Sequence, residues 1–356
     1  MITLPGRYQP IGGPTSGGMS HARVCLDNHL GRNVLIKELQ PGVDQRRLLD
    51  EIAALTAIRS KHVVQLYDVV RDAKSNIVGI VEEYIPGEDL LSLVPVSDLS
   101  LFLRTAYAMA CGISDIHATG RVHRDIKPNN VKFDAEGCLK IFDFGLARTG
   151  SVDAATQGAV GTTGYMAPEL CVDDDQIADF DQAIDTYAFG ATMLRLLAGT
   201  LPPDLRRSPP RLPCAAADFS AQSLQLPMEV AAALNRCLSF DRGDRPEMAF
   251  VRETVGAELL RDQHRAAFVV QGTLHNLSAT QRNVTITLTP LGAARFTYDG
   301  LRFLVTPVTG EIFVNNVPVG AESVLPKSSV VTFGGTDRGM GRVHVPFDVS
   351  HPEVVL

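Results

Sequence analysis

The chain has 356 residues and a formal net charge of −7, with 45 % apolar, 21 % charged and 6 % aromatic side chains. This length favours about two globular domains. The acidic balance argues against a nucleic-acid partner, because nucleic-acid backbones are bound by clustered lysine and arginine. Six scattered cysteines without a Cys-x-x-Cys pair indicate reduced thiols. Since there is no signal-like leader and no apolar run of about 18 residues, we expect a cytoplasmic protein without a membrane partner.

The first part of the chain alternates short apolar runs with one helical stretch. We expect strands at 22–26, 34–39, 63–70 and 77–84, where β-branched residues are frequent. A helix is expected over about 44–59, where apolar residues recur at helical spacing. These patterns predict a unit of mixed α and β content.

Helices dominate the following part. Residues 98–118 place apolar side chains at helical spacing, and further helices are expected at 183–199, 228–240 and 247–266. A proline-rich segment, 201–226, lies between the second and third of these helices. Its prolines permit a polyproline II helix that binds a partner, but we favour the alternative of a surface loop.

The pattern changes after Phe268. Threonine and valine become frequent, apolar and polar residues alternate over 284–288, and turn residues recur every eight to twelve positions. These features are typical of a small all-β sandwich or barrel. We therefore expect a second domain over 267–356.

Three short motifs follow one another in the middle of the chain. They are His-Arg-Asp-Ile-Lys-Pro-Asn-Asn at 123–130, Asp-Phe-Gly at 143–145 and Ala-Pro-Glu at 167–169. Phosphoryl transfer requires an oriented hydroxyl and neutralised phosphate charge rather than covalent chemistry. Asp125 can accept a hydrogen bond from a hydroxyl, while Asn130 and Asp143 offer hard oxygen ligands to a metal ion. In this order and at this spacing, the motifs are strongly specific.

On these motifs, residues 1–266 resemble the catalytic domain of protein kinases, and especially the eukaryotic-like Ser/Thr kinases of bacteria. The resemblance implies an α+β fold of two lobes, with an N-lobe over about 1–87 and a C-lobe over about 88–266. It also implies ATP and Mg²⁺, or Mn²⁺ in its place, as cofactors, and proteins as substrates. Asp125 would orient the acceptor hydroxyl, and Asn130 and Asp143 would hold the metal ion.

Upstream, residues 34–37 resemble the family's strand whose lysine reaches the α- and β-phosphates of ATP. Glu51 falls on the apolar face of the expected helix, beside Leu55, because each helical residue advances about 100°. A carboxylate on an apolar face is costly unless it is paired. The resemblance implies Lys37 as the partner of Glu51; the alternative is a surface glutamate.

The resemblance also implies residues around the nucleotide. The loop over the phosphates keeps only part of the usual glycine pattern and would contain Gly17, Gly18, Ser20 and Ala22. The rest of the pocket would be formed by Leu35, Lys37, Glu83, Ile85, Asp89 and Lys132.

Two charged residues stand where the family usually has other residue types. Glu82 is expected at the back of the nucleotide pocket and Lys132 at its floor. Because opposite charges border one apolar pocket, they suggest a Glu82–Lys132 ion pair. The alternative, which we favour, is that both side chains reach solvent.

Further residues bear on which hydroxyl accepts the phosphate and on how the activity is regulated. Lys127 and Thr162 match the Ser/Thr class of the family, and the Ala-Pro-Glu motif is normally missing from small-molecule phosphotransferases. Thr156 resembles the autophosphorylation position of bacterial relatives, where a phosphate could order the loop by pairing with arginine. The family also implies that Asp185 anchors the catalytic loop and that Arg245 pairs with Glu169.

Residues 312–334 weakly resemble the final strands of forkhead-associated domains, which bind phosphothreonine. The Gly-Arg and Ser-x-x-His pattern of those domains is missing, so we expect an interaction module for a protein or phosphoprotein partner rather than a defined phosphothreonine site. For the whole chain, we expect a Ser/Thr protein kinase. The alternatives are a nucleotide-binding pseudokinase scaffold and, less favoured, a small-molecule phosphotransferase.

Overall fold

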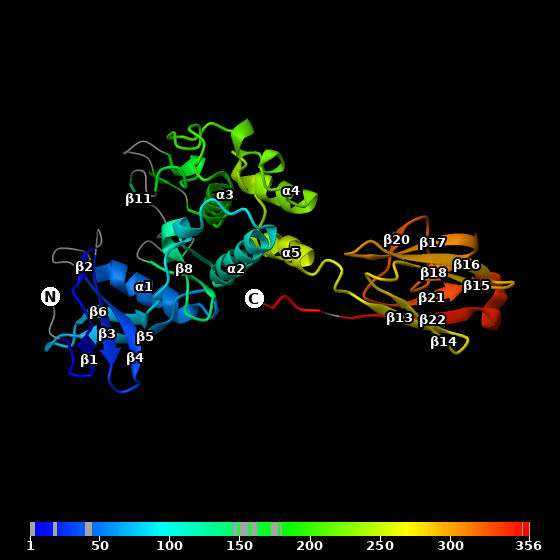
Figure 1. The fold of residues 1–356 in the computed structure, drawn as a ribbon, viewed down its shortest axis with the longest axis horizontal. Coiled ribbons are helices and arrows are strands. Elements are labelled where there is room, and N and C mark those ends of the chain that lie inside the picture. Colours follow the sequence, from blue (N-terminus) through cyan, green and yellow to red (C-terminus); the bar gives the residue numbers. More distant parts are fainter. Residues whose placement is uncertain are drawn as a thin grey trace. The chain divides into compact units, whose positions relative to one another are not determined.

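The structure is a computed structural model that describes residues 4–16, 20–39, 45–144, 148–149, 156–157, 162–171, 177–178, 180–350 and 352–355. Its contacts divide the chain into two compact units, Met1–Val255 and Gly256–Val355. The first unit is α+β with two lobes, and the second is built from strands (Figure 1). The fold class expected from the sequence is therefore confirmed.

An antiparallel sheet and one helix form the N-lobe. The strand order is β1-β3-β4-β6-β5, with β2 paired to β3. The elements are β1 (Tyr8–Pro10), β2 (Thr15–Ser16), β3 (Ser20–Asp27), β4 (Arg32–Leu39), α1 (Gln45–Ala57), β5 (Leu66–Arg71) and β6 (Ile77–Glu83). Helix α1 contacts β5 and β6. All four expected strands and the expected helix are present.

The alternation of side chains along β4 decides which of its residues reach the site. Val34 and Ile36 are fully buried in the sheet's apolar cluster. Because successive side chains of a strand point to opposite faces, Leu35 and Lys37 share the other face. In the register of β4 with β6, Leu35 lies opposite Glu82, so the Glu82 side chain is on the face of Lys37.

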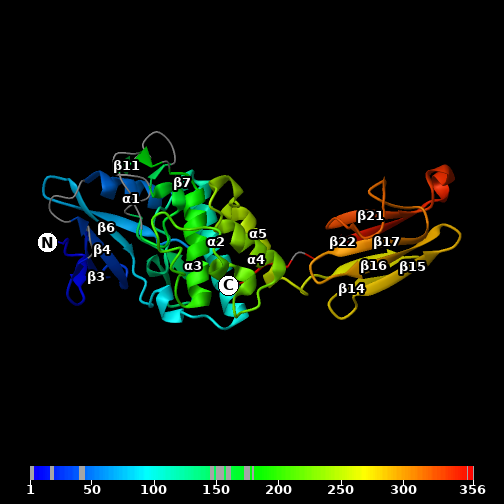
Figure 2. The same ribbon diagram turned by 90° about the horizontal axis from the view of Figure 1, so that it is seen from above.

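Helices α2 and α3 form the centre of the C-lobe and lie side by side (Figure 2). The helices are α2 (Leu99–Ala118), α3 (Ala183–Ala198), α4 (Met228–Cys237) and α5 (Met248–Leu259). The short strands are β7 (Arg121–Val122), β8 (Val131–Phe133), β9 (Leu139–Ile141), β10 (Arg148–Thr149), β11 (Thr156–Gln157) and β12 (Ile177–Ala178). The 3₁₀ helices are η1 (Leu90–Leu93), η2 (Pro128–Asn130), η3 (Pro168–Leu170), η4 (Ala215–Ala217), η5 (Phe219–Ala221) and η6 (Arg242–Asp244).

A glycine allows α2 to approach the strand that precedes the Asp-Phe-Gly motif. A Cβ atom at Gly112 would lie 2.8 Å from Cδ1 of Ile141 in β9 and 3.1 Å from the backbone oxygen of His62. This close packing places β9, the strand that leads to Asp143, against the buried face of α2.

One expectation about the C-lobe needs correction, and one less favoured alternative is not present. Helix α5 ends at Leu259 rather than at residue 266, because the chain turns at Asp262, whose φ is 65° and whose N–H donates to the carbonyl of Gly300 at 2.8 Å. The proline-rich segment 201–226 forms turns with η4 and η5, not a polyproline II helix.

The second unit is a sandwich of two antiparallel sheets, ordered β14-β13-β22-β21-β18-β19 and β15-β16-β17-β20. The two sheets share one apolar core. It contains alternating residues of β15 and aromatic rings of the other sheet, such as Phe268 and Phe347. The elements are β13 (Ala266–Val270), β14 (Thr273–Leu277), β15 (Asn283–Leu288), β16 (Gly292–Tyr298), β17 (Phe303–Gly310), β18 (Ile312–Val314), β19 (Val317–Pro318), β20 (Ser323–Val324), β21 (Ser328–Phe333), η7 (Thr336–Gly341) and β22 (Val343–Val349).

Among the residues that the structure describes, no helix combines the length and the apolar character that a membrane crossing requires.

Candidate active site

Asp185 at the start of α3 anchors the loop that carries the His-Arg-Asp motif. Its carboxylate accepts hydrogen bonds from the backbone N–H groups of His123 at 2.7 Å and Arg124 at 2.9 Å, and contacts Nε2 of His117 at 3.0 Å. Burial alone would raise the pKa of Asp185, but the bonds from His117 and from the His123 N–H lower it. A buried anion therefore holds the loop, as the family resemblance implies.

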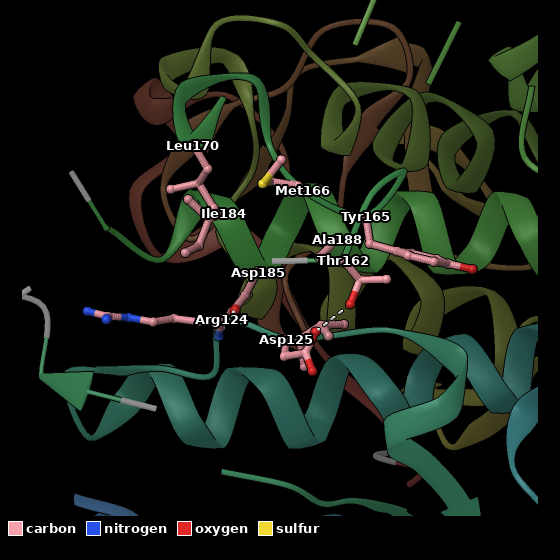
Figure 3. A pocket seen from close by; sticks show the side chains of 10 residues that line it. Arg124, Asp125, Thr162, Tyr165, Met166, Leu170, Ile184, Asp185 and Ala188 are labelled. Atoms are coloured by element: carbon pink, nitrogen blue, oxygen red, sulfur yellow. Dashed lines mark hydrogen bonds between the residues drawn. The ribbon is translucent and has the colours of Figure 1, made fainter. Parts of the chain in front are cut away.

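Asp125 is the centre of a hydrogen-bonded cluster on this loop. Nδ2 of Asn130 donates to both the backbone oxygen and Oδ2 of Asp125, each at 2.8 Å. Nζ of Lys127 lies 2.7 Å from Oδ2. Oγ1 of Thr162 donates to Oδ1 at 3.0 Å (Figure 3). Lys127 also donates to Thr162 at 2.9 Å. These contacts fix the orientation of a carboxylate that is 13 % exposed and can still accept a proton donor.

Lys37 gathers three carboxylates from three different elements. Its Nζ lies 3.0 Å from Oε1 of Glu51 on α1, 3.1 Å from Oε2 of Glu82 on β6, and 3.9 Å from Oδ1 of Asp143 after β9. Burial alone would lower the pKa of Lys37, but the charges of Glu82 and Glu51 raise it. The predicted pairing of Lys37 with Glu51 is present, and the surface position considered for Glu51 is wrong.

The backbone holds Asp143 in an exposed position beside Asn130. Asp143 has a φ of 69°, and its side chain is 54 % exposed. The following residue, Phe144, is buried, with its ring centroid 4.6 Å from that of His123. The N–H of Phe142 donates to the carbonyl of Asn130 at 3.0 Å, so the two motifs run on adjacent backbones.

The donor set fits a hard divalent cation. Asn130 uses its Nδ2 for both bonds to Asp125, which leaves its amide oxygen available, and the Asp143 carboxylate is largely exposed. Carboxylate and amide oxygens are the ligands that Mg²⁺ and Mn²⁺ prefer, usually together with waters and substrate phosphates.

A pocket lies at residues 83–85, the hinge that leads from the N-lobe to the C-lobe. It brings together residues that the family resemblance assigns to binding of the nucleotide base. It has a cavity volume of about 90 Å³ and is lined by Leu35, Val64, Glu82, Glu83, Tyr84, Ile85, Lys132 and Phe142. Asp89 lies at the start of η1, where its carboxylate accepts bonds from the Leu91 N–H and from Nδ2 of Asn129, each at 3.0 Å. Asp89 is therefore occupied by protein donors in this structure.

The phosphate loop is described only at its two edges. Gly17 and Gly18 lie outside the described residues, while β2 and β3 pair with Thr15 opposite Ala22. Ser20 begins β3. For Thr156, the backbone pairs with Ala178 across β11 and β12.

The proposed Glu82–Lys132 ion pair is wrong. Glu82 is 1 % exposed and pairs with Lys37, while Nζ of Lys132 lies 5.7 Å from the ring centroid of Phe142. The favoured alternative is also wrong for Glu82, which does not reach solvent. The reason is the register of β6 with β4, which directs Glu82 toward Lys37. Sequence reasoning missed this contact because strand register depends on the pairing of distant segments.

Arg245 secures the Ala-Pro-Glu segment at 167–169. Its guanidinium donates to both carboxylate oxygens of Glu169, at 2.7 and 2.8 Å, and to the backbone carbonyls of Ser239, Phe240 and Ala183. Bidentate pairs of this kind are strong and directional. The predicted pairing of Arg245 with Glu169 is confirmed.

Comparison with known families agrees with this geometry. Residues 9–253 match the family described as protein kinase domain, so the chain belongs to that family. Members of this family use ATP with a divalent metal ion and act on proteins.

Among curated proteins, the chain is 31 % identical over 217 residues to the probable serine/threonine-protein kinase PknB of Bifidobacterium longum, covering 55 % of this chain and 31 % of the relative. It is 34 % identical over 234 residues to the serine/threonine-protein kinase drp72 of Corynebacterium efficiens, covering 59 % and 44 %. It is also 31 % identical over 208 residues to mitogen-activated protein kinase 14 of Xenopus laevis, covering 55 % of each. The chain thus spans about a third to about half of the length of these relatives.

Proposed function

We propose that the protein is a serine/threonine protein kinase that transfers the γ-phosphate of ATP to protein hydroxyls. The observation that carries this proposal is the set of contacts around Asp125 and Lys37. Asp125 is oriented by Asn130 and Thr162, and Lys37 lies 3.9 Å from Asp143. Such an arrangement can orient an alcohol and hold a triphosphate without covalent chemistry.

Each residue would have a distinct role. Asp125 accepts the hydrogen bond of the incoming hydroxyl and turns its oxygen toward the γ-phosphate, while Lys127 offsets charge on that phosphate. Lys37, held by Glu51, binds the α- and β-phosphates. Asn130 and Asp143 would hold Mg²⁺, with Mn²⁺ as a substitute, and the bound metal neutralises phosphate charge.

The base would occupy the hinge pocket between Leu35 and Lys132, with hydrogen bonds to the backbone of Glu83 and Ile85. Asp89 would exchange its protein donors for ribose hydroxyls. The loop from Gly17 and Gly18 to Ser20 and Ala22 would cover the phosphates. The pocket lined by Leu35, Glu83, Ile85 and Lys132 supports this placement.

The preference for serine and threonine is supported by the contact of Lys127 with Thr162, which closes the loop around Asp125 at 2.9 Å. This contact matches the Ser/Thr class of the family. We infer in addition that Thr156 is a site of autophosphorylation. Mass spectrometry of active protein should find phosphate on Thr156, and an unmodified loop in fully active protein would contradict this.

Transfer of labelled phosphate from ATP to the protein itself and to a generic basic protein tests the proposed activity. We expect transfer with Mg²⁺ and a loss of at least about 100-fold in kcat for Asp125→Asn, because the amide cannot orient the hydroxyl in the same way. A purified chain that uses ATP with neither Mg²⁺ nor Mn²⁺ would overturn the proposal.

A second candidate is a scaffold that binds nucleotide without useful turnover. The observation in its favour is that Lys37 is shared by Glu51, Glu82 and Asp143 before any phosphate arrives. Tight nucleotide binding with no transfer above the level of Asp125→Asn would support the scaffold.

For the second unit we propose an interaction module that binds a protein or phosphoprotein partner. Its own apolar core, which includes Phe268, Phe296 and Phe347, supports a separate module. Binding of phosphothreonine peptides to the full chain, compared with the same peptides without phosphate, would show whether phosphate is recognised.

A further inference from the structure

Glu82 is a buried carboxylate with an unusual surrounding. It is 1 % exposed, and its nearest charged atom is Nζ of Lys37 at 3.1 Å. Apart from this ammonium, neither of its carboxylate oxygens has a hydrogen-bond donor among the residues that the structure describes. The same side chain lines the hinge pocket assigned to the base.

We propose that Glu82 takes up a proton when a nucleoside triphosphate binds beside Lys37, so that Glu82 sets the pH range over which the nucleotide binds well. This inference rests on the proposed nucleotide site. The proton comes from solvent and bonds to one carboxylate oxygen of Glu82, while Lys37 keeps its own proton and turns its charge toward the phosphates.

The charges around Glu82 explain why it should be protonated. Lys37 projects from β4, Glu51 from α1, and Asp143 follows β9, so one ammonium faces three carboxylates. On β5 the residue opposite Glu82 is the apolar Leu66. Lys132 on β8 lines the same pocket, but its ammonium lies over the Phe142 ring. Within the described part of the chain, Lys37 is therefore the only cation within 4.0 Å of Glu82.

Burial raises the pKa of Glu82 to about 7, against the opposing effect of Lys37. With its Mg²⁺ ion a triphosphate still carries net negative charge and draws the Lys37 ammonium toward itself, so the pKa of Glu82 should rise further. Glu82 would then be ionised above pH 7 in the free protein and neutral in the complex. Between the pKa of Glu82 in the free protein and its higher pKa in the complex, nucleotide affinity should fall by up to about tenfold for each unit that the pH rises.

Calorimetric binding of adenylyl imidodiphosphate with Mg²⁺ tests the proposal without requiring turnover. Titrations at pH 8 in two buffers with different heats of ionisation give the number of protons taken up. We expect the wild type to take up close to one proton more than Glu82→Gln, a neutral variant of the same shape. Glu88→Gln, at an exposed position in the segment that follows β6, should match the wild type. At pH 5.5 the difference should vanish.

Equal proton uptake by the wild type and Glu82→Gln at pH 8 would overturn this inference and leave the kinase assignment intact. A wild type that binds no nucleotide would overturn both. If Glu82→Gln does not fold, the carboxyl ¹³C signals of glutamate-labelled wild type decide the question. One signal should titrate with a midpoint near pH 7 in the free protein, and this midpoint should rise above pH 8 when the analogue is bound. The lack of such a signal would contradict the proposal.

Discussion

Lys37 can be buried because three carboxylates lie within 3.0 to 3.9 Å of its ammonium group. Taking a charge out of water costs several kcal/mol unless partners compensate it. The compensation is mutual, since Glu51 and Glu82 are themselves buried. Removal of the lysine should therefore affect the fold as well as the reaction.

For Lys37→Met we expect a loss of about 3–5 kcal/mol in the free energy of unfolding, because two buried carboxylates lose their cation. Phosphate transfer should fall below detection in the same variant. Thermal and urea unfolding measure the first effect. Lys74→Met, at an exposed position between β5 and β6, is the matched control and should unfold like the wild type. Equal stabilities for all three proteins would show that the buried pairing is not needed for folding.

Glu82 also predicts a pH dependence of stability. Its pKa is raised from 4.5 to about 7 in the folded protein, so the folded state binds this proton more tightly than the unfolded state. The contribution of this proton to the free energy of unfolding is fully present below pH 4.5 and is lost as the pH rises through about 7. Relative to Glu82→Gln, the wild type should lose about 3 kcal/mol of unfolding free energy between pH 4.5 and 8. Denaturant titrations at both pH values measure this, and a constant difference would contradict it.

At the scale of elements, the site depends on how α3 and the catalytic loop are joined. Asp185 at the start of α3 accepts two backbone N–H groups of the loop and a ring nitrogen of His117. An asparagine has one acceptor oxygen and cannot satisfy all three donors. In an asparagine variant, the loop that carries Asp125 would lose part of its support, whereas the nucleotide pocket would keep its own contacts.

For Asp185→Asn we therefore expect kcat to fall about 10- to 100-fold, while the KM for ATP stays within about twofold. The reason is that Lys37 and the hinge pocket lie on other elements. Steady-state kinetics at varied ATP concentration separates the two parameters. An increase in KM with unchanged kcat would contradict the assignment of Asp185 to the catalytic loop.

Local patterns in the sequence were sufficient to predict most elements and part of the site. The helical phase placed Glu51 on the face that meets Lys37, and the motif spacing brought Asp125 and Asn130 together. The contact between Glu82 and Lys37 was not predictable in this way, because it depends on the register between β4 and β6. The end of α5 was missed for a similar reason, since the Asp262 N–H bonds to the distant Gly300.

At the scale of the whole molecule, each compact unit has its own apolar core. Only the first contains the residues proposed to bind nucleotide. In calorimetry of the full chain, Mg²⁺ with adenylyl imidodiphosphate at 100 times its Kd should stabilise the first unit by about 2.7 kcal/mol. A transition of that unit that does not move with nucleotide would contradict the placement of the site.

The most direct test of the account is the residue on which the γ-phosphate arrives. Labelled ATP with Mg²⁺, a mixed protein substrate and analysis of phosphoamino acids would measure this for the wild type and Asp125→Asn. We expect label on serine and threonine with the wild type, and at least about 100-fold less with the variant. Label on small molecules, label on tyrosine alone, or equal transfer by both proteins would contradict it.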